Sequence, residues 1–286
     1  MHPLRRPPYP HHPRAMTVAL GAVYDSGILL CADSLVTTNT LGWYESKIRG
    51  WRIDGADLIF AIAGAVAFAE SAVNRCKRKF VTLANRNIET IESEIRDELE
   101  SEYKRHRPKT EEEYWLLAVL RTSEGIKLLK CQRGLVNEVS KGIEFIGAGE
   151  DLARFLLEPA HHKFLSEDEL SSMAAHAVGL IKKRMPGIVG GDNVMMLLSN
   201  GGHLSWRSKK ELDLIEWFGN EYHRHAAEVL RSALIGTNDD DACNDALERF
   251  YKAVQSQRVQ LRNSRDKMPG APPLHALSAV EDLRSA

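Results

Sequence analysis

Thr17 directly follows Met16 and begins an apolar run, so cleavage before it would leave a threonine at the N-terminus. That residue would carry a hydroxyl and a free α-amine together. A hydroxyl becomes an effective nucleophile when a base removes its proton, and an α-amine with a pKa of about 7.7 to 8 is such a base near neutral pH. An amide nitrogen inside the chain is not basic. Thr17 is therefore a candidate nucleophile whose chemistry depends on where the mature chain begins.

The 16 residues before Thr17 are rich in proline, arginine and histidine, and they contain no apolar stretch of the kind found in secretory signals. Their prolines oppose helix and strand, so we expect residues 1–16 to be disordered. The segment is either a short propeptide or upstream sequence from a start codon placed too early. Met16-Thr17 favours the second reading, because a small second residue permits removal of an initiator methionine.

Three further residues follow Thr17 in an order that could support this chemistry. Asp33 ends the apolar run in Cys-Ala-Asp-Ser, Lys47 lies in Ser-Lys-Ile-Arg, and Gly64 closes Ala-Ile-Ala-Gly before a helical pattern. Together with Thr17 this ordered set resembles the proteasome-type N-terminal-nucleophile hydrolases, and within them the β-subunit-like threonine peptidases. The resemblance covers residues 17–198.

The resemblance implies a role for each candidate catalytic residue. Thr17 would attack a peptide carbonyl with its own amine as general base. Lys47 would favour an alkoxide-like oxygen, and Asp33 would keep Lys47 protonated and oriented. Two unit charges about 4 Å apart interact by roughly 4 kcal/mol at an effective dielectric constant of about 20. The Gly64 backbone N–H would stabilise the oxyanion, a contact typically worth about 3 to 4 kcal/mol.

The resemblance also implies how a substrate would bind. The backbones of Thr37 and Gly64 would hold a peptide as an added strand. The first specificity pocket would be formed near four side chains: Val36, Glu45, Ile62 and Val66. The expected partners are a peptide or unfolded protein substrate, further copies of the chain in a homo-oligomeric ring, and an ATPase or regulator.

The sequence departs from the family pattern at accessory positions. A serine expected between two glycines is replaced by Ala148, and an aspartate and a serine expected before Gly190-Gly191 are replaced by Pro186 and Val189. Asp192 or Asn193 could substitute from the other side of the glycine pair. We therefore expect activity that is slow or narrow.

The elements that must position these residues follow from periodicity and turn signals. In chain order we expect a hairpin over 17–33, a polar stretch over 34–46, strands over 47–53 and 57–63 around Asp54-Gly55, helices over 65–80 and 88–105, a hairpin over 114–131, a short helix ending at Leu157, a helix capped by Ser166 and Glu169 and ending near Pro186-Gly187, and a strand over 194–198. Two sheets covered by helices on both outer faces satisfy this order, which predicts an α+β, four-layer αββα sandwich.

We expect four segments: residues 1–16, the hydrolase domain over 17–205, a helical extension over 206–264 with helices at 212–234 and 242–261, and a loose tail over 265–286.

The chain of 286 residues has a formal net charge of -1 and no apolar run long enough to span a bilayer. We therefore expect a cytoplasmic protein without nucleic-acid or membrane partners. Its four scattered cysteines are expected to be reduced. No motif predicts a metal or another cofactor.

The leading interpretation is a threonine endopeptidase. Two alternatives remain open: a catalytically inactive ring or scaffold subunit that keeps its N-terminal extension, and an N-terminal-nucleophile amidase that acts on a small amide.

Overall fold

The computed structural model describes residues 17–37, 42–106, 113–186 and 188–217, and also 248–249, 252, 255–256 and 259. The chain divides into two compact units, Met1–Glu216 and Trp217–Ala286. The segment 1–16, most of the predicted C-terminal helices and the whole predicted tail lie outside the described residues. The predicted boundaries of these segments stay predictions.

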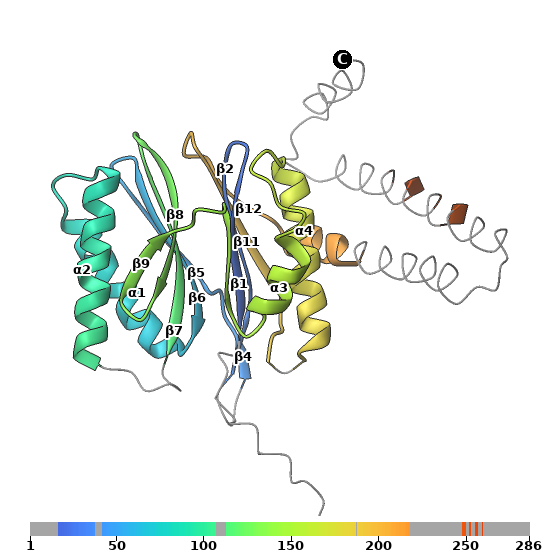
Figure 1. The fold of residues 1–286 in the computed structure, drawn as a ribbon, viewed down its shortest axis with the longest axis horizontal. Coiled ribbons are helices and arrows are strands. Elements are labelled where there is room, and N and C mark those ends of the chain that lie inside the picture. The colour runs from blue at the N-terminus through green and yellow to red at the C-terminus, as the bar shows by residue number, and fades with distance from the viewer. Residues whose placement is uncertain are drawn as a thin grey trace, which may run out of the picture. The chain divides into compact units, whose positions relative to one another are not determined.

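The described residues of the first unit form two five-stranded antiparallel sheets and a small two-stranded sheet (Figure 1). The strand orders of the large sheets are β10-β1-β2-β11-β12 and β5-β6-β7-β8-β9. The strands are β1 (Val18–Tyr24), β2 (Gly27–Asp33), β3 (Leu35–Thr37), β4 (Gly42–Tyr44), β5 (Ile48–Ile53), β6 (Ala56–Gly64), β7 (Tyr114–Thr122), β8 (Gly125–Gln132), β9 (Leu135–Glu138), β10 (Ile143–Gly147), β11 (Asn193–Ser199) and β12 (Leu204–Trp206). The helices are α1 (Val66–Thr82), α2 (Ile88–His106), α3 (Glu150–Leu157) and α4 (Glu167–Arg184), and residues 209–217 are also helical.

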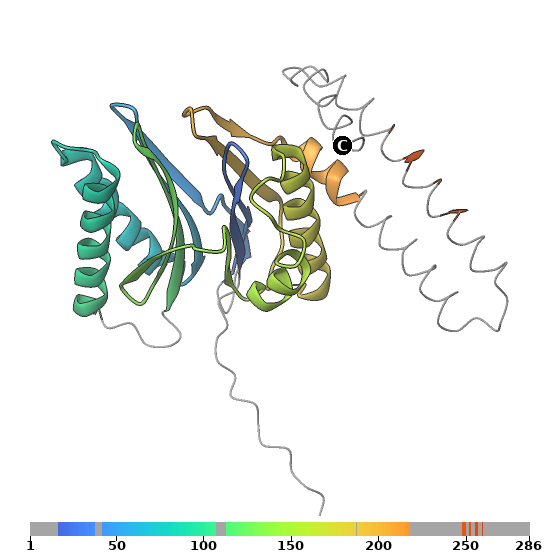
Figure 2. The ribbon, with the colours of Figure 1, turned by 45° about the horizontal axis from the view of Figure 1, so that its top comes forward.

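The elements form four layers, which confirms the predicted αββα sandwich (Figure 2). Helices α1 and α2 cover the sheet that contains β6, and α3 and α4 cover the sheet that contains β1. Alternate side chains of a strand point to opposite faces. Leu58 and Phe60 of β6 therefore pack beneath α1 and α2, whereas Ile59 and Ala61 pack between the two sheets. Both faces of β6 are buried, which explains its nearly continuous apolar sequence.

Two hairpins were predicted correctly from their sequences. Tyr24 pairs with Gly27 at the end of the first hairpin. In the hairpin of β5 and β6, Asp54 and Gly55 both have positive φ, of 49° and 80°. Two consecutive residues with positive φ are the requirement of a type I′ turn, which Asp-Gly sequences satisfy well.

Short strands were not predicted. The stretch 34–46 was read as polar and irregular, yet it contains β3 and β4, which pair with each other. Strand β9 extends the sheet beyond β8, and β12 pairs with β11 after the last predicted strand. Segments of three or four residues are too short to show a clear alternation of apolar and polar side chains.

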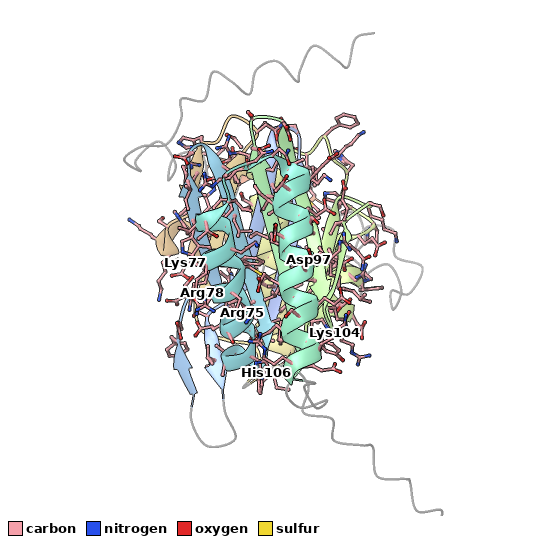
Figure 3. The ribbon with its side chains drawn as sticks, turned by 90° about the vertical axis from the view of Figure 1, so that its left-hand side faces the viewer. Arg75, Lys77, Arg78, Asp97, Lys104 and His106 are labelled. Carbon is pink, nitrogen blue, oxygen red and sulfur yellow. The ribbon has the colours of Figure 1, made fainter. Side chains whose placement is uncertain are left out.

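Helices α1 and α2 lie side by side on the outside of their sheet and carry many charged side chains (Figure 3). Some acidic residues of α2 pair with basic residues of α1. Arg75 lies 2.7 Å from Glu98, and Lys79 lies 3.1 Å from Glu94. Glu102 is buried between the two helices. The charged residues of α2 therefore contribute to its packing against α1.

Helix α4 begins with the predicted capping box. The Ser166 hydroxyl accepts the Glu169 N–H, and the Glu169 carboxylate accepts the Ser166 N–H. None of the described helices is long and apolar enough to cross a membrane. Cys31, Cys76 and Cys131 are buried free thiols, and the fourth cysteine lies outside the described residues.

Candidate active site

Thr17 lies immediately before β1, a strand paired with β2 on one side and β10 on the other. Its carbonyl accepts the Ala148 N–H at 2.7 Å, and the residue is only 2% exposed. Gly147, the last residue of β10, has φ of 94°, and a Cβ there would lie 2.2 Å from the Thr17 carbonyl oxygen. Only glycine permits this approach, so Gly147 fixes the backbone of Thr17.

Asp33 is the last residue of β2 and is fully buried. The register that pairs Ala19 with Ala32 brings Asp33 beside the start of β1. The Val18 N–H donates to Oδ1 of Asp33 at 3.1 Å, and the Gly190 N–H donates to Oδ2 at 3.0 Å. Asp33 is therefore held by backbone donors from two separate segments.

Lys47 precedes β5 and joins Thr17 to Asp33. Its Nζ donates to the Thr17 hydroxyl oxygen and to Oδ1 of Asp33, the latter at 2.8 Å. The Lys47 residue is 3% exposed, and its carbonyl accepts the Ile62 N–H at 3.0 Å. Three residues that are 16 and 14 positions apart in sequence thus meet in one buried contact.

Burial and pairing act in opposite directions on the two charged groups. Burial lowers the pKa of the Lys47 ammonium, while the charge and hydrogen bond of Asp33 oppose that shift. Burial raises the pKa of the Asp33 carboxyl, while Lys47 and the N–H groups of Gly190 and Val18 oppose it. The two charges depend on each other, because a buried ion is costly when its partner is removed.

Gly64 ends β6 next to this contact. Strand β6 packs against both β1 and β10, and a Cβ on Gly147 would lie 3.2 Å from the side chain of Ala63. Gly64 has φ of 93°, and a Cβ there would lie 2.5 Å from the Glu113 carbonyl oxygen. The glycine is required by backbone geometry. Its role as an oxyanion donor stays a prediction.

The predicted substrate-binding residues lie in different environments. Thr37 ends β3, and Val36 before it is buried. Ile62 is buried in the core beneath α1 and α2. Its side chain therefore contributes to packing there. Val66 begins α1 and is half-buried.

Glu45 lies in the loop before Lys47 and pairs with Arg49, with 2.5 Å between Nη2 and Oε1. The same guanidinium lies 2.8 Å from Glu70 of α1. Two carboxylates thus share one arginine at the start of β5. The predicted contact of Glu45 with a substrate stays a prediction.

The residues at the accessory positions, Ala148, Pro186 and Val189, carry no hydroxyl group that could contact Thr17. Ala148 binds Thr17 through its backbone N–H, and Val189 is buried in the core beside α4. The Asp192 carboxylate pairs with Lys209 at 2.6 Å. The Asn193 side-chain amide donates toward the Ala175 carbonyl, at 3.4 Å. Both suggested substitutes therefore contact residues other than Thr17.

Sequence reasoning missed the backbone groups of the site. Val18, Ala148 and Gly190 contribute N–H donors, and backbone donors leave no mark on residue type. Gly147 and the Gly190-Gly191 pair gave the available signal, because glycines cluster where chains approach closely. The sequence analysis used these glycines only to locate the accessory positions at Ala148, Pro186 and Val189.

Comparisons with known proteins agree on the fold. No protein-family model and no curated protein matches the chain. Among solved structures, Anbu (ancestral beta-subunit) from Yersinia bercovieri superimposes with a TM-score of 0.63 at 15% identity, over 72% of this chain and 94% of that one. Anbu from Hyphomicrobium sp. strain MC1 gives 0.62 at 13% identity, over 73% and 96%. An Anbu (Gly-1) mutant from the same strain gives 0.65 at 12%, over 75% and 99%. Similarity at these identities shows a proteasome-like fold and not an activity.

These structures correct the predicted family. The sequence pattern indicated a proteasome β-subunit-like threonine peptidase, whereas the matching structures are Anbu proteins, a distinct family related to proteasome β subunits. The prediction was wrong because it rested on Thr17, Asp33, Lys47 and Gly64. Related families can share such a set.

Proposed function

We propose that this chain is an N-terminal threonine hydrolase that cleaves peptide bonds, with Thr17 as nucleophile once residues 1–16 are absent. One observation carries the proposal: Lys47 Nζ contacts both the Thr17 hydroxyl and the Asp33 carboxylate inside a buried site. A lysine exposed on the surface would be solvated by water and would not need contacts with a hydroxyl and a carboxylate. A hydroxyl held against a buried, paired lysine is suited to nucleophilic attack.

In the first half of the reaction, Thr17 Oγ1 attacks the carbonyl carbon of the scissile amide. Its proton passes to the Thr17 α-amine, directly or through a water molecule. The Lys47 ammonium favours the negative charge that develops on Oγ1, and the Gly64 N–H receives the carbonyl oxygen as an oxyanion. The α-amine then gives its proton to the leaving nitrogen, which departs as an amine and leaves an ester on Thr17.

In the second half, water attacks the ester carbonyl and loses a proton to the same α-amine. The tetrahedral intermediate collapses, the bond to Oγ1 breaks, and the proton returns to Oγ1. The acid product leaves and Thr17 is restored. Asp33 keeps Lys47 charged and directed toward Oγ1 throughout, which the 2.8 Å contact supports.

The test compares Thr17→Ala and Thr17→Ser on a panel of fluorogenic peptides and small amides. Thr17→Ala should lose activity by at least about 10³-fold, because it lacks the nucleophile, whereas Thr17→Ser should keep part of it. Equal hydrolysis by wild type and Thr17→Ala would refute the proposal. Turnover of small amides without peptide cleavage would instead favour an amidase.

An inactive ring or scaffold subunit is the second candidate. It is supported by the absence of a hydroxyl at Ala148, where the family pattern has a serine. A threonine-directed epoxyketone separates the candidates, because stable labelling needs both the hydroxyl and the free amine of Thr17. Labelling at Thr17 excludes the scaffold.

A further inference from the structure

A second lysine, Lys182, is linked to Asp33 of the site through the backbone turn of Gly190 and Gly191. Lys182 belongs to α4 and is mostly buried, with its side chain 15% exposed. Its Nζ donates to the Gly191 carbonyl at 3.0 Å and lies 3.0 Å from Oε2 of Glu216. The Asn193 amide donates to the same Glu216 oxygen at 3.3 Å. The Lys182–Glu216 pair therefore holds the backbone turn that contains Gly191.

That turn is also a donor to the site. Gly190 precedes Gly191 and gives its N–H to Oδ2 of Asp33, while its carbonyl accepts the Leu35 N–H at 3.0 Å. The Asp192 N–H donates to the Ser34 hydroxyl at 2.8 Å. Each contact links the turn to the segment that begins with Asp33. A shift of the turn would therefore change the hydrogen bond that Gly190 gives to Asp33.

The packing around Glu216 brings it close to α4. A Cβ on Gly179 would lie 2.6 Å from Cγ of Glu216, so glycine at this position allows residues 209–217 to approach the helix. Glu216 is 20% exposed, and its charge is matched by Lys182. A partly buried ion pair that also holds a backbone carbonyl is suited to fixing geometry, because breaking it leaves an uncompensated charge.

We propose that Lys182 and Glu216 are a positioning pair: they fix the Gly190–Gly191 turn so that the Gly190 N–H orients Asp33, and through it Lys47. This inference rests on the proposed function. It also offers a physical replacement for the accessory side chains that the sequence lacks at Pro186 and Val189. Positioning here acts on the Asp33 carboxylate through the backbone of the turn.

The first test measures kcat and KM of the mature protein, with active sites counted by titration with a covalent inhibitor. Lys182→Met should lower kcat per active site about tenfold and change KM less than about twofold, because small displacements of positioned groups slow chemistry more than binding. Lys182→Arg should recover most of the loss, since a guanidinium can reach the same two partners. Lys183→Met removes an exposed charge from the next position of α4 and should have no effect.

The second test needs no activity. Amide hydrogen exchange, followed residue by residue, should be at least about tenfold faster at Gly190 in Lys182→Met, while the Val18 amide, which binds the other oxygen of Asp33, stays protected. Glu216→Gln should shift both readouts in the same direction by less, which keeps the inference testable if Lys182→Met fails to fold.

The outcomes separate the two proposals. Unchanged kcat per active site and unchanged Gly190 exchange in Lys182→Met, with only a lower unfolding temperature, would overturn the positioning role. If the wild-type protein shows no Thr17-dependent hydrolysis, the proposed function is refuted. Faster exchange of the Gly190 amide in Lys182→Met than in wild type would still support the link from Lys182 to Asp33. Loss of kcat with equal loss in Lys183→Met would also overturn the positioning role.

Discussion

Lys47 is the residue on which the proposed chemistry most depends, because its ammonium contacts both the nucleophile and the buried carboxylate. Lys47→Met should lower kcat/KM by at least about 10³-fold, since charge stabilisation near the attacking oxygen is lost. It should also destabilise the fold at pH 7 by about 3 to 5 kcal/mol, because Asp33 is left as an unpaired buried charge. Peptide hydrolysis and urea unfolding measure the two effects.

The pH dependence of that stability loss is a sharper check. Without Lys47, burial holds the pKa of the Asp33 carboxyl above its unfolded value of about 3.9. Such a group favours folding below the unfolded pKa and loses that contribution as pH rises through the folded pKa. The stability gap between Lys47→Met and wild type should therefore narrow as pH is lowered. Adding Asp33→Asn should restore stability at pH 7 but not activity; a gap that is constant with pH would contradict this account.

Gly147 gives a second prediction at the scale of one residue. In Gly147→Ala the new Cβ would meet the Thr17 carbonyl oxygen, and its φ of 94° is strained for alanine. The variant should unfold at lower urea concentration, by about 1 to 3 kcal/mol, and should lose hydrolysis because Thr17 is displaced. Gly55→Ala is the matched control, with positive φ but nothing within 4 Å, so it should keep full activity. Equal activity in both variants would argue against a positioning role for Gly147.

Candidate side chains for the site could be selected from the sequence, whereas backbone groups could not. Thr17, Asp33 and Lys47 were selected by residue type and order, and the structure brings them together. The N–H groups of Val18 and Gly190 depend on register and on a turn after α4. Neither depends on which side chain the donor residue carries.

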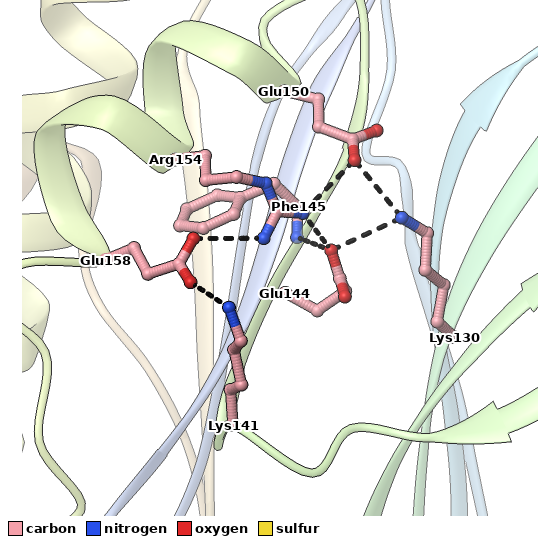
Figure 4. A network of polar contacts seen from close by, with 7 residues as sticks. All are labelled: Lys130, Lys141, Glu144, Phe145, Glu150, Arg154 and Glu158. Carbon is pink, nitrogen blue, oxygen red and sulfur yellow. Dashed lines mark hydrogen bonds and ion pairs between the residues drawn. The ribbon is translucent and has the colours of Figure 1, made fainter.

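At the scale of elements, an ionic network joins the two sheets beside β10 and α3 (Figure 4). Glu144 of β10 accepts hydrogen bonds from Arg154 of α3 at 2.6 Å and from Lys130 of β8 at 3.3 Å. Its carboxylate also accepts the Phe145 N–H at 3.0 Å. Strand β10 ends at Gly147, so this network anchors the strand that carries the contact to Thr17.

Glu144→Gln tests that network. Burial alone would raise the pKa of the Glu144 carboxyl, but the Phe145 N–H, Arg154 and Lys130 outweigh it and the pKa is lowered. A lowered pKa adds stability above the unfolded value of about 4.3 and loses it as pH falls through the folded value. Glu144→Gln should therefore cost up to about 1 kcal/mol at pH 7, since partial exposure weakens the network, and less at pH 3. Thermal unfolding at both pH values checks this; a larger loss at low pH would contradict it.

Long elements were predictable and short ones were not. The hairpins, α1, α2 and α4 follow from apolar periodicity, an Asp-Gly turn and a capping box. Strands β3, β4, β9 and β12 have three or four residues each, and pairing with neighbours stabilises them more than local preference does. The sequence pattern also did not point to the Anbu structures, because they share the fold with this chain at only 12% to 15% identity.

At the scale of the whole molecule, residues 206–216 belong to the first compact unit. Arg207 pairs with Glu167 and Asp168 at the start of α4, at 2.8 and 2.9 Å, and Leu212 is buried in the core of that layer. A chain ending after Trp217 should therefore keep a cooperative unfolding transition. A chain ending after Ser205 should lose several kcal/mol, since a buried leucine alone contributes about 2 to 5.

The two truncated chains are compared by urea unfolding, and by hydrolysis if the longer one is active. Because Glu216 is absent only from the shorter chain, the longer one should also keep the slow exchange of the Gly190 amide. Equal stability of both chains would contradict the assignment of residues 206–216 to the first unit.

The central claim is that Thr17 acts as an N-terminal nucleophile, and intact mass spectrometry before and after treatment with a threonine-directed epoxyketone tests it most directly. The account predicts a chain that begins at Thr17 and gains the mass of one inhibitor, with the adduct on Thr17 and no gain in Thr17→Ala. The account would be contradicted if the wild-type chain retained residues 1–16, stayed unlabelled and hydrolysed peptides at the same rate as Thr17→Ala.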